Sequence, residues 1–302
     1  MKFDINFFLV FLLLAVLVLA SGQMGCPQEE EVEFNTTALI MNFVENAPPN
    51  ELVTGLKYPI YVDIKNLGGY DVPKGAAHFY LSGIGDNLEN VQTHVQNVNF
   101  LNKRTGTQEG GQERISFATE AEPWKTLPAP FNLNIQIDSC YSYATITQTS
   151  ICVGKGNTIC SISGEKIETG SNSAAPIQIS SLTESMTGNK LFVTFRIENK
   201  GLGEVYLPNT DCDKLQAQDI NEKLKQNQVE ISIRVEEGVT CRLQQSTEPY
   251  GTIDALDGIT SIGQVTCQKV IEGAESHLSP FEIVLSYKYR EKISKSITIL
   301  PE

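Results

Sequence analysis

The feature that most restricts the fold of this chain of 302 residues is an internal repeat. The stretch IYVDIKNLGG, which begins at Ile60, has a counterpart in LFVTFRIENKG, which begins at Leu191. Both stretches alternate apolar and polar residues and end in Asn-x-Gly, at Asn66 and at Asn199. Alternation predicts a strand with one buried face, and Asn and Gly favour the turn that ends it. Two copies of this pattern predict two domains of one fold.

The ends of the two halves match as well. The motif Tyr141-x-Tyr143 has its counterpart 146 positions later, in Tyr287-x-Tyr289. Short alternating runs separated by Gly, Pro, Asn and Asp fill each half, which is typical of β-sandwiches. We therefore expect an all-β fold of two tandem immunoglobulin-like β-sandwiches. The expected domains cover residues 36–154 and 174–302, and a linker rich in Gly and Ser covers residues 155–173.

One segment of the second half predicts a helix instead of a strand. The stretch DKLQAQDINEKLKQ, which begins at Asp213, consists mostly of good helix formers. Asp211 and Asp213 are both suited to the N-cap position, where a short acceptor side chain binds the first main-chain amides. The second sandwich is therefore expected to contain a short inserted helix.

The N-terminus resembles an export signal. The apolar run from Phe7 to Ala20 is too short to cross a membrane comfortably and matches the apolar region of a signal peptide. We interpret residues 1–25 as this signal, with a lipoprotein-type signal as one form, and residues 26–35 as an acidic spacer. Three outcomes remain open: cleavage by an ordinary signal peptidase after residues 20–22, lipid attachment at Cys26, or retention as an anchor. All three place the rest of the chain outside the membrane.

Two further features describe the expected surroundings. Asn35 begins an Asn-Thr-Thr sequon, which predicts glycosylation of its side chain. The net charge of −13 argues against a nucleic-acid partner, because phosphate backbones are bound by clustered Lys and Arg. We expect the membrane as a partner, through the N-terminal lipid or anchor, together with an unknown surface protein or glycan.

The cysteines favour an oxidising compartment. The chain has seven of them, and setting Cys26 aside for a lipid leaves an even number. If the strand after Leu133 turned back near Ile146, Cys140 would face Cys152 at a separation suited to a disulfide. We therefore predict a Cys140–Cys152 disulfide. Another pairing, or a metal or redox site, are the alternatives.

The remaining four cysteines allow three pairings. Cys241 and Cys267 end strand-like runs of one domain, so we favour a disulfide between them. This choice leaves Cys160, in the linker, to pair with Cys212, in the loop before the predicted helix. Such a bond would hold the linker against the second domain.

Several of these residues carry a resemblance to known proteins. The strand that ends in Asn-x-Gly and soon reaches a Pro resembles the CARDB-like, immunoglobulin-like modules of bacterial and archaeal surface proteins. The chain is also similar to uncharacterised exported proteins of small-genome archaea, through the ordered set Cys140-Tyr141-x-Tyr143, Ile151-Cys152, Cys160, Ala175-Pro176 and Tyr287-x-Tyr289 followed by Ile293-Ser294-Lys295-Ser296-Ile297. The resemblance implies a fold and export, and it implies no reaction.

The sequence offers few residues for chemistry. Its three histidines are His78, His94 and His277, and none of them falls in a metal-spaced motif. His78 lies within a predicted strand, which favours a structural role. Nucleophile elbows, phosphate-binding loops and HExxH motifs are absent from the sequence. We therefore expect no catalytic residue, no metal ligand and no cofactor.

These observations favour a non-catalytic, exported protein of the cell surface or envelope that acts in adhesion or envelope assembly. An extracellular glycan- or peptide-binding module is the alternative, and it would show a groove with exposed aromatic side chains or a free sheet edge. A secreted hydrolase on a β-scaffold is a second alternative, and it would show polar groups converging in a pocket.

Overall fold

A computed structural model of the chain describes residues 36–123, 129–156, 158–244, 252–273 and 275–301. Residues from Phe34 onwards form one compact unit. Strands dominate this unit, and the helices among its described residues are the short α2 (Cys212–Gln216) and α3 (Ile220–Lys223). The prediction of an all-β fold is therefore confirmed. Within the described ranges, no helix is long and apolar enough to cross a membrane.

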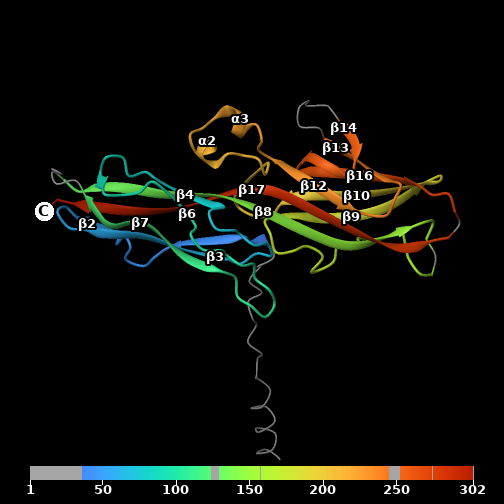
Figure 1. Cartoon of the computed structure of the whole chain (residues 1–302), viewed down its shortest axis with the longest axis horizontal. Helices are drawn as coiled ribbons and strands as arrows, with labels where there is room; N and C mark the ends of the chain where they lie inside the picture. Colours follow the sequence, from blue (N-terminus) through green and yellow to red (C-terminus); the bar gives the residue numbers. More distant parts are fainter. Residues whose placement is uncertain (1–35, 124–128, 157, 245–251, 274, 302) are drawn as a thin grey trace, which may run out of the picture. The chain divides into compact units, whose positions relative to one another are not determined.

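Two long strands form the centre of the fold. Strand β8 (Phe131–Val153) and strand β17 (His277–Leu300) pair antiparallel along almost their whole length. Their register runs without a shift from His277 opposite Val153 to Ile299 opposite Phe131. Figure 1 shows them as the green and red ribbons that lie side by side. Strands of globular proteins usually have five or six residues, so this pair is exceptionally long.

The long pair lies within an eight-stranded sheet whose main path is β15-β12-β17-β8-β4-β6, with β11 and β2 on the outer edge of β17. Strands β4 and β6 continue the sheet beside the first half of β8. Strands β12 and β15 continue it beside the first half of β17. The bounds of these shorter strands are Glu51–Val53 for β2, Ala77–Ser82 for β4, His94–Gln96 for β6, Glu204–Tyr206 for β11, Gln228–Arg234 for β12 and Asp257–Ser261 for β15.

Two smaller antiparallel sheets cover the eight-stranded sheet. One has the order β1-β3-β7-β5 and the other the order β14-β13-β16-β10-β9. Their bounds are Leu39–Phe43 for β1, Tyr58–Asn66 for β3, Leu88–Glu89 for β5, Gln112–Pro123 for β7, Ile177–Thr187 for β9, Lys190–Asn199 for β10, Val239–Gln244 for β13, Thr252–Ala255 for β14 and Gly263–Val270 for β16. Buried apolar side chains from all three sheets form one continuous core.

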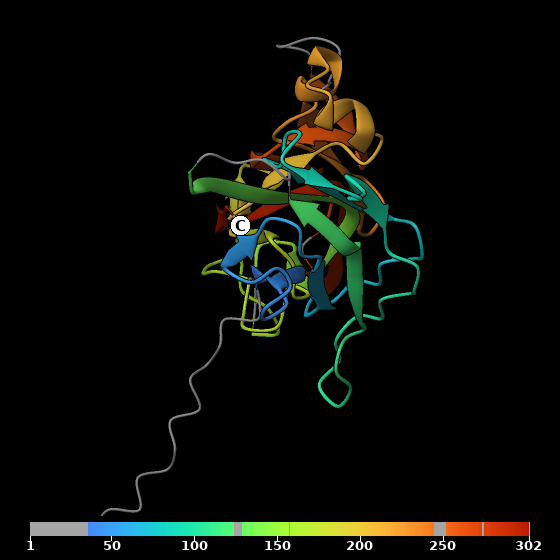
Figure 2. The same ribbon diagram turned by 90° about the vertical axis from the view of Figure 1, so that its left-hand side faces the viewer.

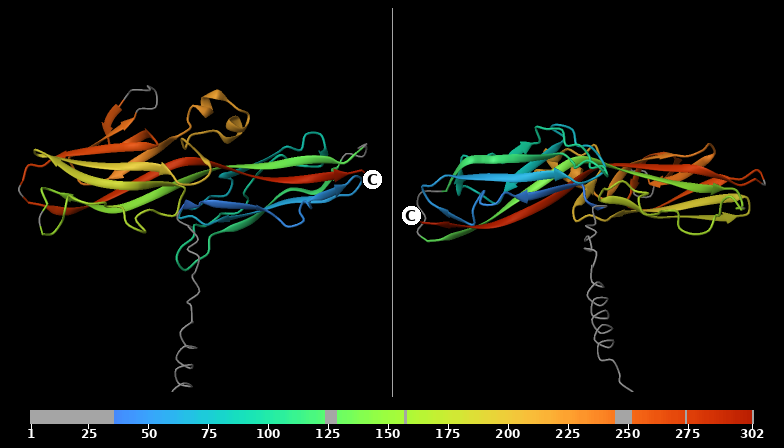
Figure 3. Two further views of the ribbon diagram at one scale, coloured as in Figure 1. Left: turned by 180° about the vertical axis from the view of Figure 1, so that it is seen from behind. Right: turned by 90° about the horizontal axis from the view of Figure 1, so that it is seen from below.

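The small sheets define two lobes at the two ends of the long strands (Figure 3). Lobe A contains β1 to β7, the first half of β8 and the second half of β17. Lobe B contains β9 to β16, the second half of β8 and the first half of β17. Each lobe thus takes one half of a long strand from the other half of the sequence.

The expected boundaries at residues 36–154 and 174–302 are therefore wrong, because they cut across both lobes. Residues 142–153 lie in lobe B, and residues 290–300 lie in lobe A. Alternation continues through β8 without a turn, so the strand never folds back near Ile146 and pairs with β17 instead. Residues 165–173 of the expected linker also belong to lobe B, where they hydrogen-bond to β8 and β9.

Four buried tyrosines mark the junction of the lobes. Tyr141 lies opposite Tyr289 in the register of the long strands, and Tyr143 lies opposite Tyr287. The rings of Tyr141 and Tyr289 meet edge to face with centroids 6.1 Å apart, a favourable arrangement for aromatic pairs. The repeated Tyr-x-Tyr motif therefore builds the shared core where the two halves of the chain cross.

The repeated Asn-x-Gly motif explains how the small sheets attach to this junction. The Asn66 side-chain oxygen accepts hydrogen bonds from the Tyr143 hydroxyl, at 3.2 Å, and from the Gly68 amide, at 3.1 Å. Asn199 does the same for Tyr289, at 3.2 Å, and for Gly201, at 3.1 Å. A β-carbon at either glycine would collide with the tyrosine hydroxyl. Glycine is therefore required at both positions.

The predicted inserted helix is present as two short helices. Asp211 caps α2 by accepting from the amides of Asp213 and Lys214, and Asp219 caps α3 in the same way. Gln218 adopts a left-handed conformation with φ of 66°, which ends the first helix. Asp213 is not an N-cap, because it lies inside the first turn of α2. Figure 2 shows this insertion above the eight-stranded sheet, on the side opposite the blue N-terminal strands.

Candidate functional site

Two of the predicted site residues, Cys26 and Asn35, lie outside the described residues. The structure therefore bears on neither the lipid anchor nor the glycosylation site. The predicted disulfides all lie within the described ranges.

The predicted Cys140–Cys152 disulfide is wrong. Both cysteines lie on the same uninterrupted strand, about 40 Å apart at the usual rise per residue. Cys140 is bonded to Cys212, with Cα atoms 5.9 Å apart. The predicted Cys160–Cys212 disulfide is also wrong, because Cys212 is bonded to Cys140 and Cys160 closes a short loop with Cys152.

The third disulfide joins Cys241 to Cys267, the pair that the sequence favoured. These residues lie directly opposite each other in the β13–β16 ladder and are completely buried in lobe B. Three disulfides in one compact unit indicate an oxidising environment.

The Cys140–Cys212 disulfide fixes the helical insertion of lobe B on the outer face of the lobe A sheet. Tyr80, Cys140 and Cys212 form a small buried apolar cluster there. Gln216, at the end of α2, accepts a hydrogen bond of 3.0 Å from Arg290 of β17. Arg290 also forms an ion pair with the buried Asp138 at 3.1 Å. The insertion is thus attached to the sheet by covalent, apolar and polar contacts.

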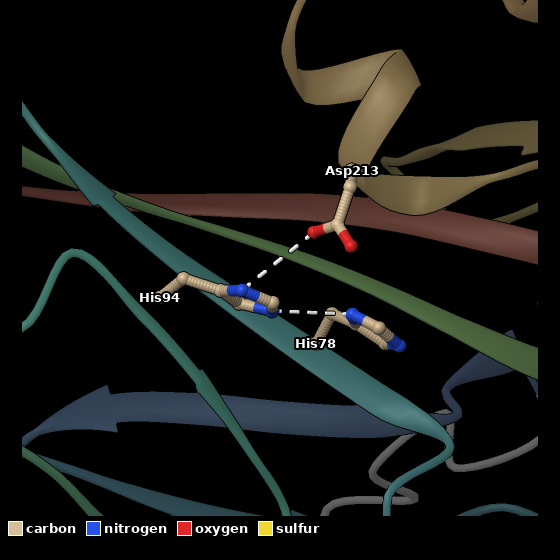
Figure 4. Close-up of side chains that lie close together, drawn as sticks. All are labelled: His78, His94 and Asp213. Carbon is tan, nitrogen blue, oxygen red and sulfur yellow. Dashed lines mark hydrogen bonds and ion pairs between the residues drawn. The ribbon is translucent and has the colours of Figure 1, made fainter.

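This attachment brings three metal-ligating side chains together. His78 of β4 and His94 of β6 lie on the outer face of the sheet, and Asp213 of α2 reaches down toward them (Figure 4). The Nδ1 atom of His78 lies 3.2 Å from Nε2 of His94. Oδ1 of Asp213 lies 3.6 Å from Nδ1 of His94. Across the three residues, potential ligand atoms lie within 4.8 Å of one another.

Tyr80 forms part of the same cluster. Its hydroxyl donates to Oδ1 of Asp213 at 2.7 Å, and its ring stacks on His94 with centroids 4.5 Å apart. Burial and the neighbouring Asp213 carboxylate raise the pKa of Tyr80, so the phenol stays protonated and keeps donating. Burial lowers the pKa of His78, which favours its neutral, ligand-competent form.

The sequence contained only part of the signal for this cluster. His78 and His94 share a face because β4 and β6 are paired, and β6, with three residues, is too short for its alternation to predict this pairing. Asp213 comes close only through the unpredicted Cys140–Cys212 disulfide. The sequence favoured a structural role for His78 and gave no sign that His94 and Asp213 lie beside it.

A second candidate site is a groove of about 970 Å³ at the junction of the lobes. It is lined by residues of β1 and of the second half of β17, together with the loop around Leu202 of lobe B. Thr37, Met41, Glu291 and Ile293 are among its lining residues, and none of the described lining residues is aromatic. A groove of this size can hold a short peptide segment or a small ligand.

The main chain of β17 is exposed along this groove. Strand β11 pairs with β17 up to Arg290, and β2 pairs with it again from Thr298. No described segment pairs with this edge of β17 at residues 291–297. The amides of Lys292 and Ser294 face this edge, because they share the two-residue alternation of Thr298, whose amide donates outward to Asn50.

The corresponding edge in lobe B is covered by the chain itself. The amide of Gln148 donates to Ser171, and the amide of Ser173 donates to the carbonyl of Ile146. The Asn172 side chain accepts a hydrogen bond from the Thr147 hydroxyl of β8 and hydrogen-bonds to Ile179 of β9, so it connects both sheets. At the repeat spacing of 146 positions, Ile146 and Gln148 correspond to Lys292 and Ser294. Lobe B therefore contains an extended segment where lobe A has its groove.

Glu291 gives the groove an unusual carboxyl group. Its Oε2 accepts a hydrogen bond of 3.0 Å from the Tyr141 hydroxyl, in the position that Thr145 occupies beside Tyr287 in lobe B. Burial raises the pKa of Glu291 to about 7. The side chain is therefore partly protonated near neutral pH.

No protein family model and no curated protein matches this chain. Among solved structures, it is similar to the secreted serine protease VesC from Vibrio cholerae, with 9% identity and a TM-score of 0.19 over 83% of this chain. The matched region is 50% of that protein, so the chain spans about half of its length. A second similar structure is an archaeal virus turret protein with a triple jelly roll fold, with 7% identity, a TM-score of 0.19 and coverage of 88% and 92% of the two chains. Likeness at this level carries no argument about fold or function.

Proposed function

We propose that this chain is a non-catalytic, exported cell-surface protein that acts in adhesion or envelope assembly by binding an extended segment of a partner protein in the lobe A groove. The exposed edge of β17 beside this groove is the observation that carries the proposal. Exposed strand edges bind extended peptides through main-chain hydrogen bonds, and neighbouring pockets select side chains. Each lobe is proposed to be an immunoglobulin-like sandwich that presents such edges and its loops.

The repeat provides a template for the bound segment. In lobe B, Ser171 and Ser173 hydrogen-bond to the main chain of β8 at Gln148 and Ile146. A partner segment in lobe A would make the equivalent bonds to Ser294 and Lys292. A glycan ligand is less well supported, because glycan sites commonly stack sugars on aromatic rings and the described lining residues include none.

The proposed location is the extracellular face of the membrane. The three disulfides support an oxidising compartment, and the N-terminal apolar run supports export. Cys26 would carry the lipid anchor, or the N-terminal segment itself would be retained as the anchor. Membrane partitioning of the wild type and of Cys26→Ala tests this part, since complete release of the wild type into the medium contradicts anchoring.

A peptide-selection experiment tests the binding site. A phage-displayed library of linear peptides is selected on the purified full chain, with its disulfides intact and in detergent. Ser294→Pro removes one outward amide of the edge, where proline is tolerated, whereas Ser294→Ala keeps the amide and removes the same hydroxyl. Selected peptides should bind Ser294→Ala like the wild type and bind Ser294→Pro about tenfold more weakly, which corresponds to one lost hydrogen bond. Equal binding to both variants, or no selectable peptide, contradicts the proposal.

A further inference from the structure

The geometry points to a divalent metal site, formed by His78, His94 and Asp213, that binds Zn²⁺ and joins the helical insertion to lobe A. The three side chains come from three elements, β4, β6 and α2. This site lies on the outer face of the eight-stranded sheet and is separate from the proposed peptide groove.

The two histidines are placed by strand pairing. His78 lies opposite Gln96 in the β4–β6 ladder, and His94 lies opposite Tyr80, so the histidines are diagonal neighbours on one face. Their closest nitrogens are 3.2 Å apart. In a tetrahedral zinc site with metal–ligand bonds of about 2.0–2.1 Å, ligand atoms lie about 3.3 Å apart. The spacing of these two nitrogens suits two imidazoles on one ion. Asp213 lies nearest the other ring nitrogen of His94, Nδ1, at 3.6 Å, so one ion would take a single nitrogen of His94 from a set of ligand atoms that lie within 4.8 Å of one another.

Asp213 is held in place by its neighbours. Cys212, the preceding residue, is covalently bonded to Cys140 of β8 beneath the insertion. The Asp213 amide donates to the Asp211 side chain at 3.0 Å, and the Tyr80 hydroxyl donates to Oδ1 of Asp213 at 2.7 Å. A carboxylate ligand oriented by a second hydrogen-bonding side chain is the usual arrangement around protein metals. Tyr80 would keep this orienting role when an ion binds.

The donor set selects the kind of ion. Two imidazole nitrogens and one carboxylate oxygen, with water in the fourth position, form a common zinc coordination set. Mg²⁺ and Ca²⁺ prefer oxygen ligands alone, so they should not compete. The rings of His78 and His94 are stacked with an interplanar angle of 16°, so His94 must turn its ring to direct a lone pair at the ion. Its side chain is exposed enough to do so, at 36%.

The surrounding charges are mixed. The charges nearest His78 have both signs: the carboxylates of Asp213 and Asp211 attract positive charge there, and the Lys288 ammonium repels it. Two further cations nearby are paired with carboxylates. Nζ of Lys214 lies 3.9 Å from Oδ2 of Asp211, and Arg290 forms an ion pair with Asp138. The carboxylates of Asp211 and Asp213, both at the start of α2, favour the binding of a dication. The Lys288 ammonium opposes it. The bound ion would add a further link between the insertion and lobe A, and this link would not depend on the redox state.

Zinc binding to the full chain tests this inference directly. Equilibrium dialysis of the disulfide-bonded protein in detergent should find one Zn²⁺ per chain, undiminished by excess Mg²⁺. His94→Gln and Asp213→Asn should each weaken binding by a factor on the order of 100, the upper range for groups that support a metal site. Asn at position 213 can still accept from Tyr80, so that variant removes the charge and keeps the hydrogen bond. His277→Gln removes the third histidine, which contacts Glu236 of lobe B, and should bind Zn²⁺ like the wild type.

A spectroscopic readout separates this site from other zinc-binding groups. Co²⁺ in place of Zn²⁺ should give the absorption of a tetrahedral nitrogen and oxygen site, and His94→Gln should abolish it. In a Cys140→Ser/Cys212→Ser variant, Zn²⁺ should slow amide hydrogen exchange in α2, because the ion replaces the lost disulfide link. The absence of stoichiometric binding, or binding that both His94→Gln and Asp213→Asn leave unchanged, overturns the inference.

Discussion

Glu291 should make the stability of this protein depend on pH near neutrality. Its carboxyl lies on the inner face of β17, bonded to the Tyr141 hydroxyl, and burial raises its pKa from 4.5 to about 7. In the unfolded chain the same carboxyl ionises near its ordinary pKa. Because the folded pKa is the higher one, the folded state holds its proton over a pH range where the unfolded state has lost it.

The sign and size of the effect follow from this difference. The contribution of the Glu291 proton to the free energy of unfolding is complete below pH 4.5. It falls by about 1.4 kcal/mol for each pH unit up to about 7 and is lost above that pH. The whole change in the free energy of unfolding is at most about 3.5 kcal/mol. Glu291→Gln keeps an acceptor for Tyr141 and removes the ionisation. The variant should therefore gain stability relative to the wild type as the pH rises from 4.5 to 8.

Urea unfolding at a series of pH values, followed by circular dichroism with the disulfides intact, measures this gain. The difference between the two proteins cancels the other titrating groups, such as the Asp63–Arg114 pair, whose depressed carboxyl pKa acts at lower pH. Glu230→Gln, at an exposed carboxyl of β12, serves as the matched control for the removal of a carboxyl charge. Parallel pH profiles for the wild type and Glu291→Gln would refute the reasoning.

Three further predictions concern the architecture. Mass mapping of the unreduced protein should find peptides joined through Cys140–Cys212 and Cys152–Cys160; a Cys140–Cys152 peptide would contradict the continuous strand. Gly201→Ala should destabilise the protein by about 2–3 kcal/mol in urea unfolding, because its β-carbon would collide with Tyr289, whereas Gly106→Ala, in open space, should change stability by less than about 0.5 kcal/mol. Asn172→Ala removes three hydrogen bonds that connect β8 and β9, and it should cost about 2–3 kcal/mol and speed hydrogen exchange at Gln148; unchanged exchange would show that this segment does not cover the edge.

The repeat predicted the β fold, since alternation and turn residues are local properties of the chain. It also identified the Asn-x-Gly and Tyr-x-Tyr motifs, whose contact the structure explains through Asn66–Tyr143 and Asn199–Tyr289. Alternation fixes which residues share a face, but it cannot tell whether a long strand folds back on itself or pairs with a distant one. The predicted Cys140–Cys152 disulfide is wrong because it assumed that the strand folds back on itself, whereas β8 pairs with β17.

The two candidate sites depend on long-range pairing, which explains why the sequence did not predict them. The groove exists because, among the described residues, no strand pairs with the outer edge of β17 between β11 and β2. The cluster of His78, His94 and Asp213 exists because a disulfide between lobes brings Asp213 to the two histidines. No local pattern of residues encodes either arrangement.

Hydrogen exchange resolved to single amides is the most direct test of the proposed function, because it measures the protection of the β17 edge amides to which the partner segment would bind. In the free protein, the amides of Lys292 and Ser294 should exchange rapidly, whereas those of Ile146 and Gln148, which are bonded to Ser173 and Ser171, should be protected. A selected peptide should slow exchange at Lys292 and Ser294 and leave the lobe B amides unchanged. Protection of Lys292 and Ser294 in the free protein, or no change when the peptide binds, would contradict the proposal that this edge is the binding site.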